Sequence, residues 1–147
     1  MDLRSLYQEV IVDHNRQPRN FGRLAHPTHH AEGFNPLCGD AINLDLTIEN
    51  GVICAISFDG QGCAISTASA SLMTEILKGK TLTDAEHLFQ LFHDALVSEQ
   101  CDDAAALGKL QVLLGVKDYP ARIKCATLAW HALQAALNQT QQPISTE

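Results

Sequence analysis

The sequence predicts a single α+β domain in which a small antiparallel sheet packs against helices, and three observations support this class. Residues 42–48 alternate apolar with polar side chains, and Asn50-Gly51 follows them as the strongest two-residue hairpin signal. Much of the remaining chain shows the periodicity of amphipathic helices. With 147 residues and 46% hydrophobic content, the chain is long enough to bury one core.

The chain opens with a helix and a long connector. Apolar residues from Leu3 to Ile11 recur at helical spacing, which predicts a helix over residues 2–14. The stretch 15–40 is rich in proline and glycine, so we expect a loop there with one short strand near 28–34.

The hairpin and the segment after it bring two cysteines into different settings. The return strand is expected at 52–59, where strict alternation would place Cys54 on the core face as a small packing residue. A helix rich in small residues then follows Cys63 and ends at Lys78-Gly79. Cys63 is therefore expected at a helix N-terminus, where free N–H groups and the helix dipole favour a thiolate.

The C-terminal half is predicted to be helical. Thr83 and Glu86 have capping-box spacing for a helix over 84–97. An acidic, alanine-rich piece runs over 102–114, and we interpret Cys101 before it as an incidental thiol. Pro120 suits the first turn of a last helix, 120–138.

The domain is expected to span residues 1–138, because residues 139–147 lack an apolar pattern and are typical of a disordered C-terminal tail. The net charge of −7 and pI near 5.4 argue against nucleic acid or an anionic membrane as partners. No stretch approaches the roughly 18 apolar residues of a membrane span, and the N-terminus does not resemble a signal peptide. We expect a cytoplasmic protein.

Three cysteines and an aspartate form the candidate site. The chain has five cysteines, an odd number that argues against a disulfide framework when no export signal is present. Cys38 and Asp40 flank Gly39 in a turn, Cys63 begins a helix, and Cys125 lies early in a proline-started helix. These settings are typical of ligands, and the distances along the chain mean that only folding could bring them together.

Such a donor set suits Zn²⁺, which binds thiolates and carboxylates tetrahedrally, and the same residues could hold a [2Fe–2S] cluster. Arg122 precedes Cys125 by one helical turn and could support the thiolates electrostatically, whereas Lys124 could equally face water. None of the histidines shares a motif with a cysteine, so we interpret them as surface or boundary residues.

Taken together, several motifs resemble the SufU branch of the IscU/NifU-N-terminal family over residues 5–137. The motifs are L-Y-Q-E-V-I-V-D-H at 6–14, P-R-N at 18–20, N-P-L-C-G-D at 35–40, G-Q-G-C-A-I-S-T-A-S-A-S at 60–71 and P-A-R-I-K-C-A-T-L-A-W at 120–130. The resemblance implies an α+β fold in which Cys38, Asp40, Cys63 and Cys125 meet at one exposed end.

Two departures separate this chain from the IscU branch. IscU proteins carry histidine where this chain has Lys124, and the separation between Cys63 and Cys125 is longer here, as in SufU proteins. The chain also has D-Y-P-A-R at 118–122 in place of the chaperone-binding segment of IscU, so we expect no such chaperone partner.

The resemblance implies a zinc-dependent sulfur carrier in iron–sulfur cluster assembly. Such a protein takes persulfide sulfur from a PLP-dependent cysteine desulfurase of the SufS type and delivers it to a downstream scaffold or acceptor protein. Our hypothesis is that the desulfurase supplies a replacement ligand and frees Cys38 as the sulfur acceptor. Two alternatives stay open: a scaffold on which a [2Fe–2S] cluster is built and transferred, and an adaptor with a purely structural zinc.

Overall fold

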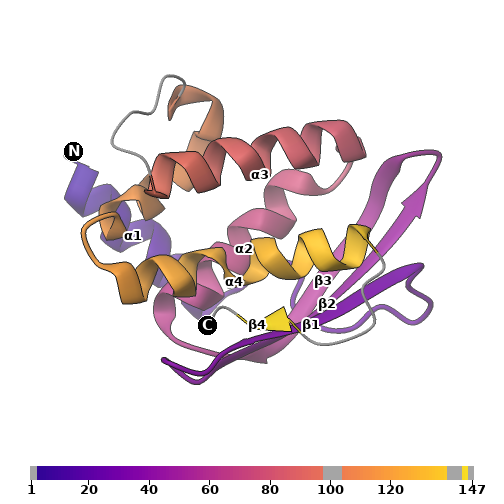
Figure 1. Cartoon of the computed structure of the whole chain (residues 1–147), viewed down its shortest axis with the longest axis horizontal. Coiled ribbons are helices and arrows are strands. Elements are labelled where there is room, and N and C mark those ends of the chain that lie inside the picture. The colour runs from indigo at the N-terminus through magenta and orange to yellow at the C-terminus, as the bar shows by residue number, and fades with distance from the viewer. Residues whose placement is uncertain (1–2, 98–103, 139–143, 146–147) are drawn as a thin grey trace.

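The computed structural model describes residues 3–97, 104–138 and 144–145. Its helices gather above a sheet that runs along one side of the molecule, and the strand nearest the C-terminus lies beside β1 (Figure 1). In chain order the elements are α1 (Leu3–Arg16), β1 (His29–Asn35), β2 (Asp40–Glu49), β3 (Val52–Gln61), α2 (Ala64–Leu77), α3 (Leu82–Val97), the 3₁₀ segment η1 (Ala104–Val116), α4 (Pro120–Leu137) and β4 (Ile144–Ser145).

The sheet has the strand order β3-β2-β1-β4. Strand β2 pairs antiparallel with both β1 and β3, which confirms the predicted α+β class with a small antiparallel sheet. Strand β4 adds a short parallel pairing in which Ile144 lies opposite Gly33. Ile144 and Ser145 fall in the stretch expected to be a tail, and residues 139–143 and 146–147 lie outside the described residues.

Cys54 corrects one prediction, because its side chain is exposed instead of packing in the core. The pairing of β2 with β3 shifts register between Thr47 and Ile48, so Thr47 lies opposite Ala55 while Ile48 lies opposite Ile53. A bulge of this kind adds a residue to one strand and breaks the alternation of faces. Ile53 is therefore the buried residue, and Cys54 points to solvent.

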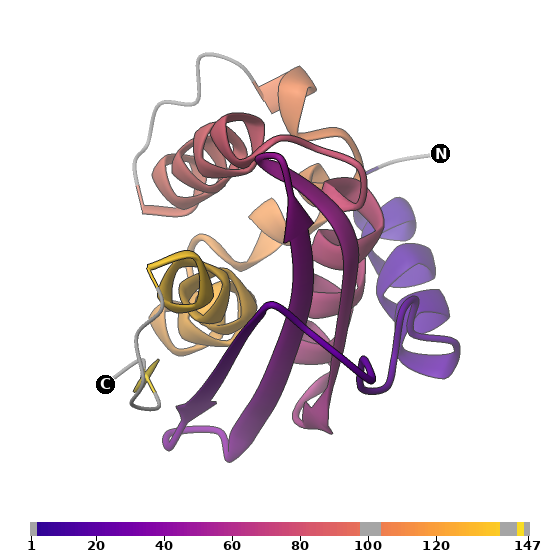
Figure 2. The same ribbon diagram turned by 90° about the vertical axis from the view of Figure 1, so that its right-hand side faces the viewer.

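The connector between α1 and β1 crosses the outer face of the sheet, in front of the strands in Figure 2. It first pairs with the edge of β3, where the N–H of Phe58 donates to the carbonyl of Asn20. It then covers Asp45, which is only 1% exposed although it lies on the polar face of β2. Arg23 Nε donates to Asp45 Oδ2 at 2.7 Å, and His30 Nδ1 lies 2.6 Å from Oδ1.

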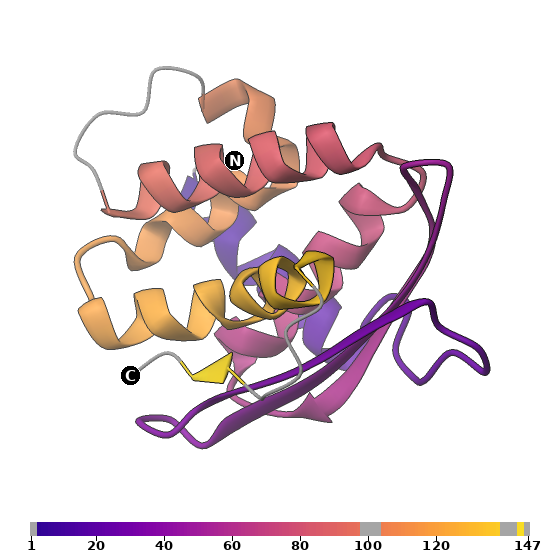
Figure 3. The same ribbon diagram turned by 45° about the vertical axis from the view of Figure 1, so that its right-hand side comes forward.

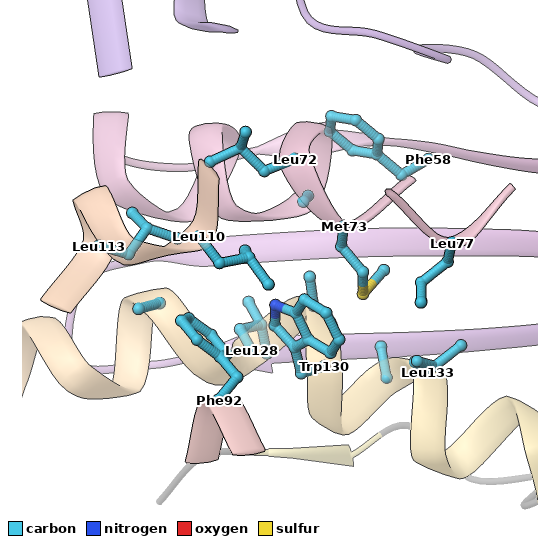
Figure 4. Close-up of a cluster of buried hydrophobic side chains, with 14 of the residues drawn as sticks. Phe58, Leu72, Met73, Leu77, Phe92, Leu110, Leu113, Leu128, Trp130 and Leu133 are labelled. Carbon is cyan, nitrogen blue, oxygen red and sulfur yellow. The ribbon is translucent and has the colours of Figure 1, made fainter. Parts of the chain in front are cut away.

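The helices cover the inner face of the sheet (Figure 3). The core is formed by buried side chains of both the helices and the sheet. Trp130 of α4 is fully buried at its centre, beside Phe92 and near Met73 (Figure 4). Its indole N–H donates to Ser69 Oγ, and the Ser69 hydroxyl donates in turn to the carbonyl of Ala126. This relay fixes α2 against α4, the two helices that carry Cys63 at the N-cap and Cys125.

Two further helix predictions change in the structure. Helix α3 begins at Leu82, and its N-cap bond runs from the N–H of Asp84 to Thr81 Oγ1, so Thr81 takes the role predicted for Thr83. The alanine-rich piece is a 3₁₀ segment with a kink at Gly108. Cys101 lies outside the described residues. No helix in the described part of the chain is both long and apolar enough to cross a membrane.

Candidate metal centre

Three of the four predicted ligands meet at one end of the sheet. Cys38 lies in the turn between β1 and β2, Asp40 begins β2, and Cys125 lies in the second turn of α4. One ligand atom from each lies within 4.8 Å of the other two, and the sulfurs of Cys38 and Cys125 are 3.2 Å apart. Asp40 is 1% exposed and Cys125 is fully buried, whereas Cys38 is half-buried. The cluster therefore reaches the surface through Cys38.

Cys63 adjoins this cluster from a different element. It is the N-cap of α2, as predicted, and its Sγ accepts a bond from the N–H of Ser66 at 3.5 Å. Its own N–H donates to Asp40 Oδ1 at 2.8 Å. Its sulfur is not part of the group whose ligand atoms all lie within 4.8 Å, but its side chain interacts with the Cys125 thiol and contributes to the raised pKa of that thiol.

Gly62 makes this close approach possible. A Cβ added at Gly62 would lie 2.9 Å from Asp40 Oδ1 and 3.1 Å from Ser66 Oγ, both tighter than ordinary contact. The absence of a side chain therefore lets the end of β3 pass the carboxylate and present the N–H of Cys63 to it. This close approach to Asp40 explains the second glycine of the G-Q-G-C motif.

Asn35, at the end of β1, is a member of the site that sequence reasoning missed. It is fully buried and lies opposite Asp40 in the strand register. Its Nδ2 donates to Asp40 Oδ2 at 3.2 Å and to Cys125 Sγ at 3.5 Å. Its position at the head of the N-P-L-C-G-D motif is the signal that could have identified it.

Burial has the largest effect on the ionisation of the Cys125 thiol at this site. Burial raises the pKa of the Cys125 thiol well above its ordinary value, and hydrogen bonds with Cys38 and Asp40 add to the effect. The exposed Arg122 lies near enough that Cys63 and Cys125, as thiolates, raise its pKa. Lys124 is half-buried on the same turn. A divalent cation would reverse the effect of burial, because it binds the deprotonated thiol.

The histidines make other contacts. His14 is buried, and its Nδ1 lies 2.6 Å from Ser71 Oγ; burial lowers its pKa. His93 and His131 lie beside the ring of Phe89. Among the described residues, no histidine joins a group of three or more potential metal ligands.

The residues present fit a metal of the zinc type. Thiolates and a carboxylate are the donors that Zn²⁺ takes, and two of the sulfurs and the carboxylate are already close together. None of the ion pairs among the described residues involves Asp40, so its buried carboxylate is held by neutral donors alone. A bound cation would offset the cost of burying this carboxylate.

Comparisons of the chain with a family model and with known proteins point to the same family. The model of the family described as NifU-like N terminal domain matches residues 6–126. The zinc-dependent sulfurtransferase SufU of Bacillus subtilis is 42% identical over 133 residues, which covers 90% of this chain and 90% of that protein. The iron–sulfur cluster assembly scaffold protein IscU of Streptococcus pyogenes is 38% identical, covering 94% of this chain and 86% of that protein.

Solved structures agree with these relatives. The crystal structure of a SufU protein from Fervidobacterium islandicum, proposed as an iron–sulfur cluster assembly scaffold for the SUF system, superposes with a TM-score of 0.84. It is 32% identical, and the match covers 90% of this chain and 97% of that one. The N-terminal part of a NifU-like protein from Brucella abortus, 22% identical, shares the fold with a TM-score of 0.83 and coverage of 91% and 93%.

Proposed function

The chain belongs to the family of the NifU-like N-terminal domain, which includes SufU and IscU proteins, and from this premise we propose that it is a zinc-dependent sulfur carrier in iron–sulfur cluster assembly. It would accept persulfide sulfur from a PLP-dependent cysteine desulfurase of the SufS type, in the cytoplasm, and pass it to a cluster scaffold or acceptor protein. The observation that carries the proposal is the convergence of Cys38, Asp40 and Cys125 within 4.8 Å.

Cys38, Asp40, Cys63 and Cys125 would hold the zinc. The three clustered residues supply donors from a turn, a strand and a helix, and Cys63 lies against Asp40 at the start of α2. When bound, Zn²⁺ would keep the buried thiols ionised at neutral pH. Arg122 would reduce the excess negative charge of three thiolates and a carboxylate from the exposed side of α4.

Cys38 is the proposed sulfur acceptor. Its Sγ is half-buried in the turn between two strands, whereas Cys125 is buried in a helix and Cys63 caps one. The Cys38 thiolate would attack the terminal sulfur of the donor persulfide, so that a new S–S bond forms at Cys38. The S–S bond of the donor breaks, and its cysteine leaves as a thiolate. No external oxidant or reductant is needed.

A [2Fe–2S] scaffold is the second candidate, because the same thiol-rich donor set could hold a cluster and because two IscU scaffold proteins are 38% and 37% identical to the chain. On this alternative Cys38, Asp40, Cys63 and Cys125 would bind iron, and the assembled cluster would be the cargo handed to an acceptor. Both candidates place the chain in cluster assembly and differ in what it carries.

The test combines metal analysis with sulfur transfer. Protein purified without added iron is expected to contain about one zinc per chain, and to accept labelled sulfur from a cysteine desulfurase supplied with cysteine. Cys38→Ser is expected to lose this acceptance. Cys54→Ser is the matched control, because Cys54 is an exposed cysteine outside the site.

One result would reject Cys38 as the sulfur acceptor, and another would reject the carrier function. A Cys38→Ser protein that accepts sulfur at the wild-type rate would remove Cys38 as acceptor. Iron and sulfide bound with visible absorption bands, lost when Cys125 is replaced, would instead establish the scaffold.

A further inference from the structure

We infer that Asn35 is a positioning residue of the thiol–carboxylate site, and that its side-chain amide helps decide which sulfur stays bound and which is released. The inference rests on the proposed function, because it concerns how the same site would hold a metal and free Cys38. It adds a residue outside the four proposed ligands.

Asn35 contacts three of the four proposed ligands. Its Nδ2 donates to Asp40 Oδ2 at 3.2 Å and to Cys125 Sγ at 3.5 Å, so one amide bridges a strand and a helix. Its backbone carbonyl accepts bonds from the N–H of Cys38 at 3.3 Å and of Gly39 at 2.9 Å. The turn that carries Cys38 is thus closed on the same residue that orients Asp40 and Cys125.

The two ends of the Asn35 side-chain amide differ in their hydrogen bonding. Oδ1 of Asn35 is buried and has no donor within the described part of the chain. A buried carbonyl without a donor is unfavourable, so the amide carries a cost at this position. Only the N–H groups of the amide are used, and both of their acceptors are proposed metal ligands.

The hydrogen bonds divide the three sulfurs into two kinds. Cys125 Sγ accepts from Asn35, and Cys63 Sγ accepts from the N–H of Ser66. In the described chain, no N–H group donates to the sulfur of Cys38, whose neighbour at 3.2 Å is the sulfur of Cys125. An N–H donor stabilises a thiolate where it lies and orients it toward a metal. Cys63 and Cys125 are therefore the anchored sulfurs, and Cys38 is the sulfur that can leave.

The experiment compares wild type with Asn35→Ala and Asn35→Leu. Leucine has the branched shape of asparagine, so it keeps the packing if the alanine variant fails to fold. The matched control is Asn43→Ala, which removes a similar bond, from Asn43 Nδ2 to Asp59 Oδ1 at 2.9 Å, outside the site. Thermal unfolding of each metal-free protein separates loss of folding from loss of metal binding.

Three readouts follow. Zinc affinity, measured by competition with a chromophoric chelator, is expected to fall about 10- to 100-fold in the Asn35 variants and to stay unchanged in the control. With Co²⁺ as a spectroscopic probe, the sulfur-to-cobalt band is expected to move to longer wavelength when the bond to Cys125 is lost. Alkylation of the zinc-loaded protein, mapped by cysteine, is expected to favour Cys38 in wild type and to lose that preference in Asn35→Leu.

The outcomes separate the two proposals. If wild type binds zinc and Asn35→Leu matches it in affinity, cobalt spectrum and alkylation pattern, the role of Asn35 is rejected and the carrier function stands. If wild type binds neither Zn²⁺ nor Co²⁺, the proposed function is rejected and this inference with it.

Discussion

Asp40 and Asp45 lie five positions apart on β2, and both are 1% exposed, yet their surroundings are opposite in character. Asp45 lies on the outer face under the connector, where Arg23 and His30 contact its two oxygens. Asp40 lies at the end of the strand and accepts bonds from the amide of Asn35 and the N–H of Cys63. It has sulfur neighbours in place of a cationic side chain.

The difference distinguishes a carboxylate that is neutralised within the fold from one that is proposed to bind a metal. A buried charge is tolerated when an opposite charge and hydrogen bonds compensate it, and Asp45 has both from its own chain. Asp40 has hydrogen bonds from neutral donors but no ion pair among the described residues. Burial of an aspartate is therefore a poor guide to function by itself, and the source of its counter-charge is the better one.

The largest expected effect is that of Asp40→Asn on metal binding. Loss of a proposed ligand should lower zinc affinity by more than about 100-fold, which exceeds the usual effect of an outer-shell change. The metal-free protein should lose little thermal stability, because removal of a buried charge without a counter-ion offsets the acceptor lost when an amide N–H₂ replaces one carboxylate oxygen. Chelator competition and thermal unfolding measure the two effects. A clear loss of metal-free stability would make Asp40 structural, like Asp45.

Asp45→Asn should show the reverse pattern. We expect the free energy of unfolding to fall by about 2 kcal/mol, less than for a fully buried pair because Arg23 is half-exposed. Zinc affinity should change by less than about twofold, since the contacts of Asp45 are not shared with the site. Urea unfolding gives the first quantity. Asp13→Asn, which breaks an exposed pair with Arg19, is the control and should cost much less stability.

Gly62→Ala should lower zinc affinity by less than Asp40→Asn does. The new Cβ would meet Asp40 Oδ1 at 2.9 Å and displace the carboxylate, so we expect about a tenfold loss of zinc affinity. Gln61→Ala, at the exposed neighbouring position, should bind zinc like wild type. Equal affinity in both variants would show that the close approach at Gly62 has no bearing on the metal.

The smallest effect concerns acid stability. Burial alone would raise the pKa of Asp45, but hydrogen bonds from Arg23 and His30 outweigh it and hold the pKa below its usual range. The unfolded chain then takes up a proton near pH 4 while the folded chain stays ionised, so stability falls as the pH drops from there to the folded pKa. Denaturant titrations in that range should show a shallower decline for Asp45→Asn, and an unchanged slope would contradict this contribution.

The sequence predicted most of the fold because its local signals agreed with the tertiary structure. The hairpin at Asn50-Gly51 and the last helix starting at Pro120 are both present. Cys54 was misplaced because strict alternation cannot anticipate a bulge, which is set by pairing with β2. The cap at Thr81 was assigned to Thr83 because two threonines flank the helix start, and only the backbone geometry selects between them.

The site was less accessible to sequence reasoning. Cys38, Asp40 and Cys125 were selected by local setting, and the structure brings these three together. That they and Cys63 bind a metal stays a prediction. Asn35 was missed because its contacts depend on the strand register opposite Asp40 and on the packing of α4, neither of which a motif displays. Asp45, likewise, has the pattern of an ordinary solvent-facing strand residue until the connector is seen to cover it.

The hydrogen bonds that link Trp130 to Ser69 and Ser69 to Ala126 make Trp130 fluorescence an intrinsic probe of the helix that carries Cys125. Trp130 is the single tryptophan of the chain, so tryptophan emission arises from one fully buried side chain. The relay ends on the carbonyl of the residue that follows Cys125, so a shift of that turn would alter the polarity around the indole. A change in the intensity or wavelength of Trp130 emission when metal binds would therefore report a structural change near Cys125 in unlabelled protein.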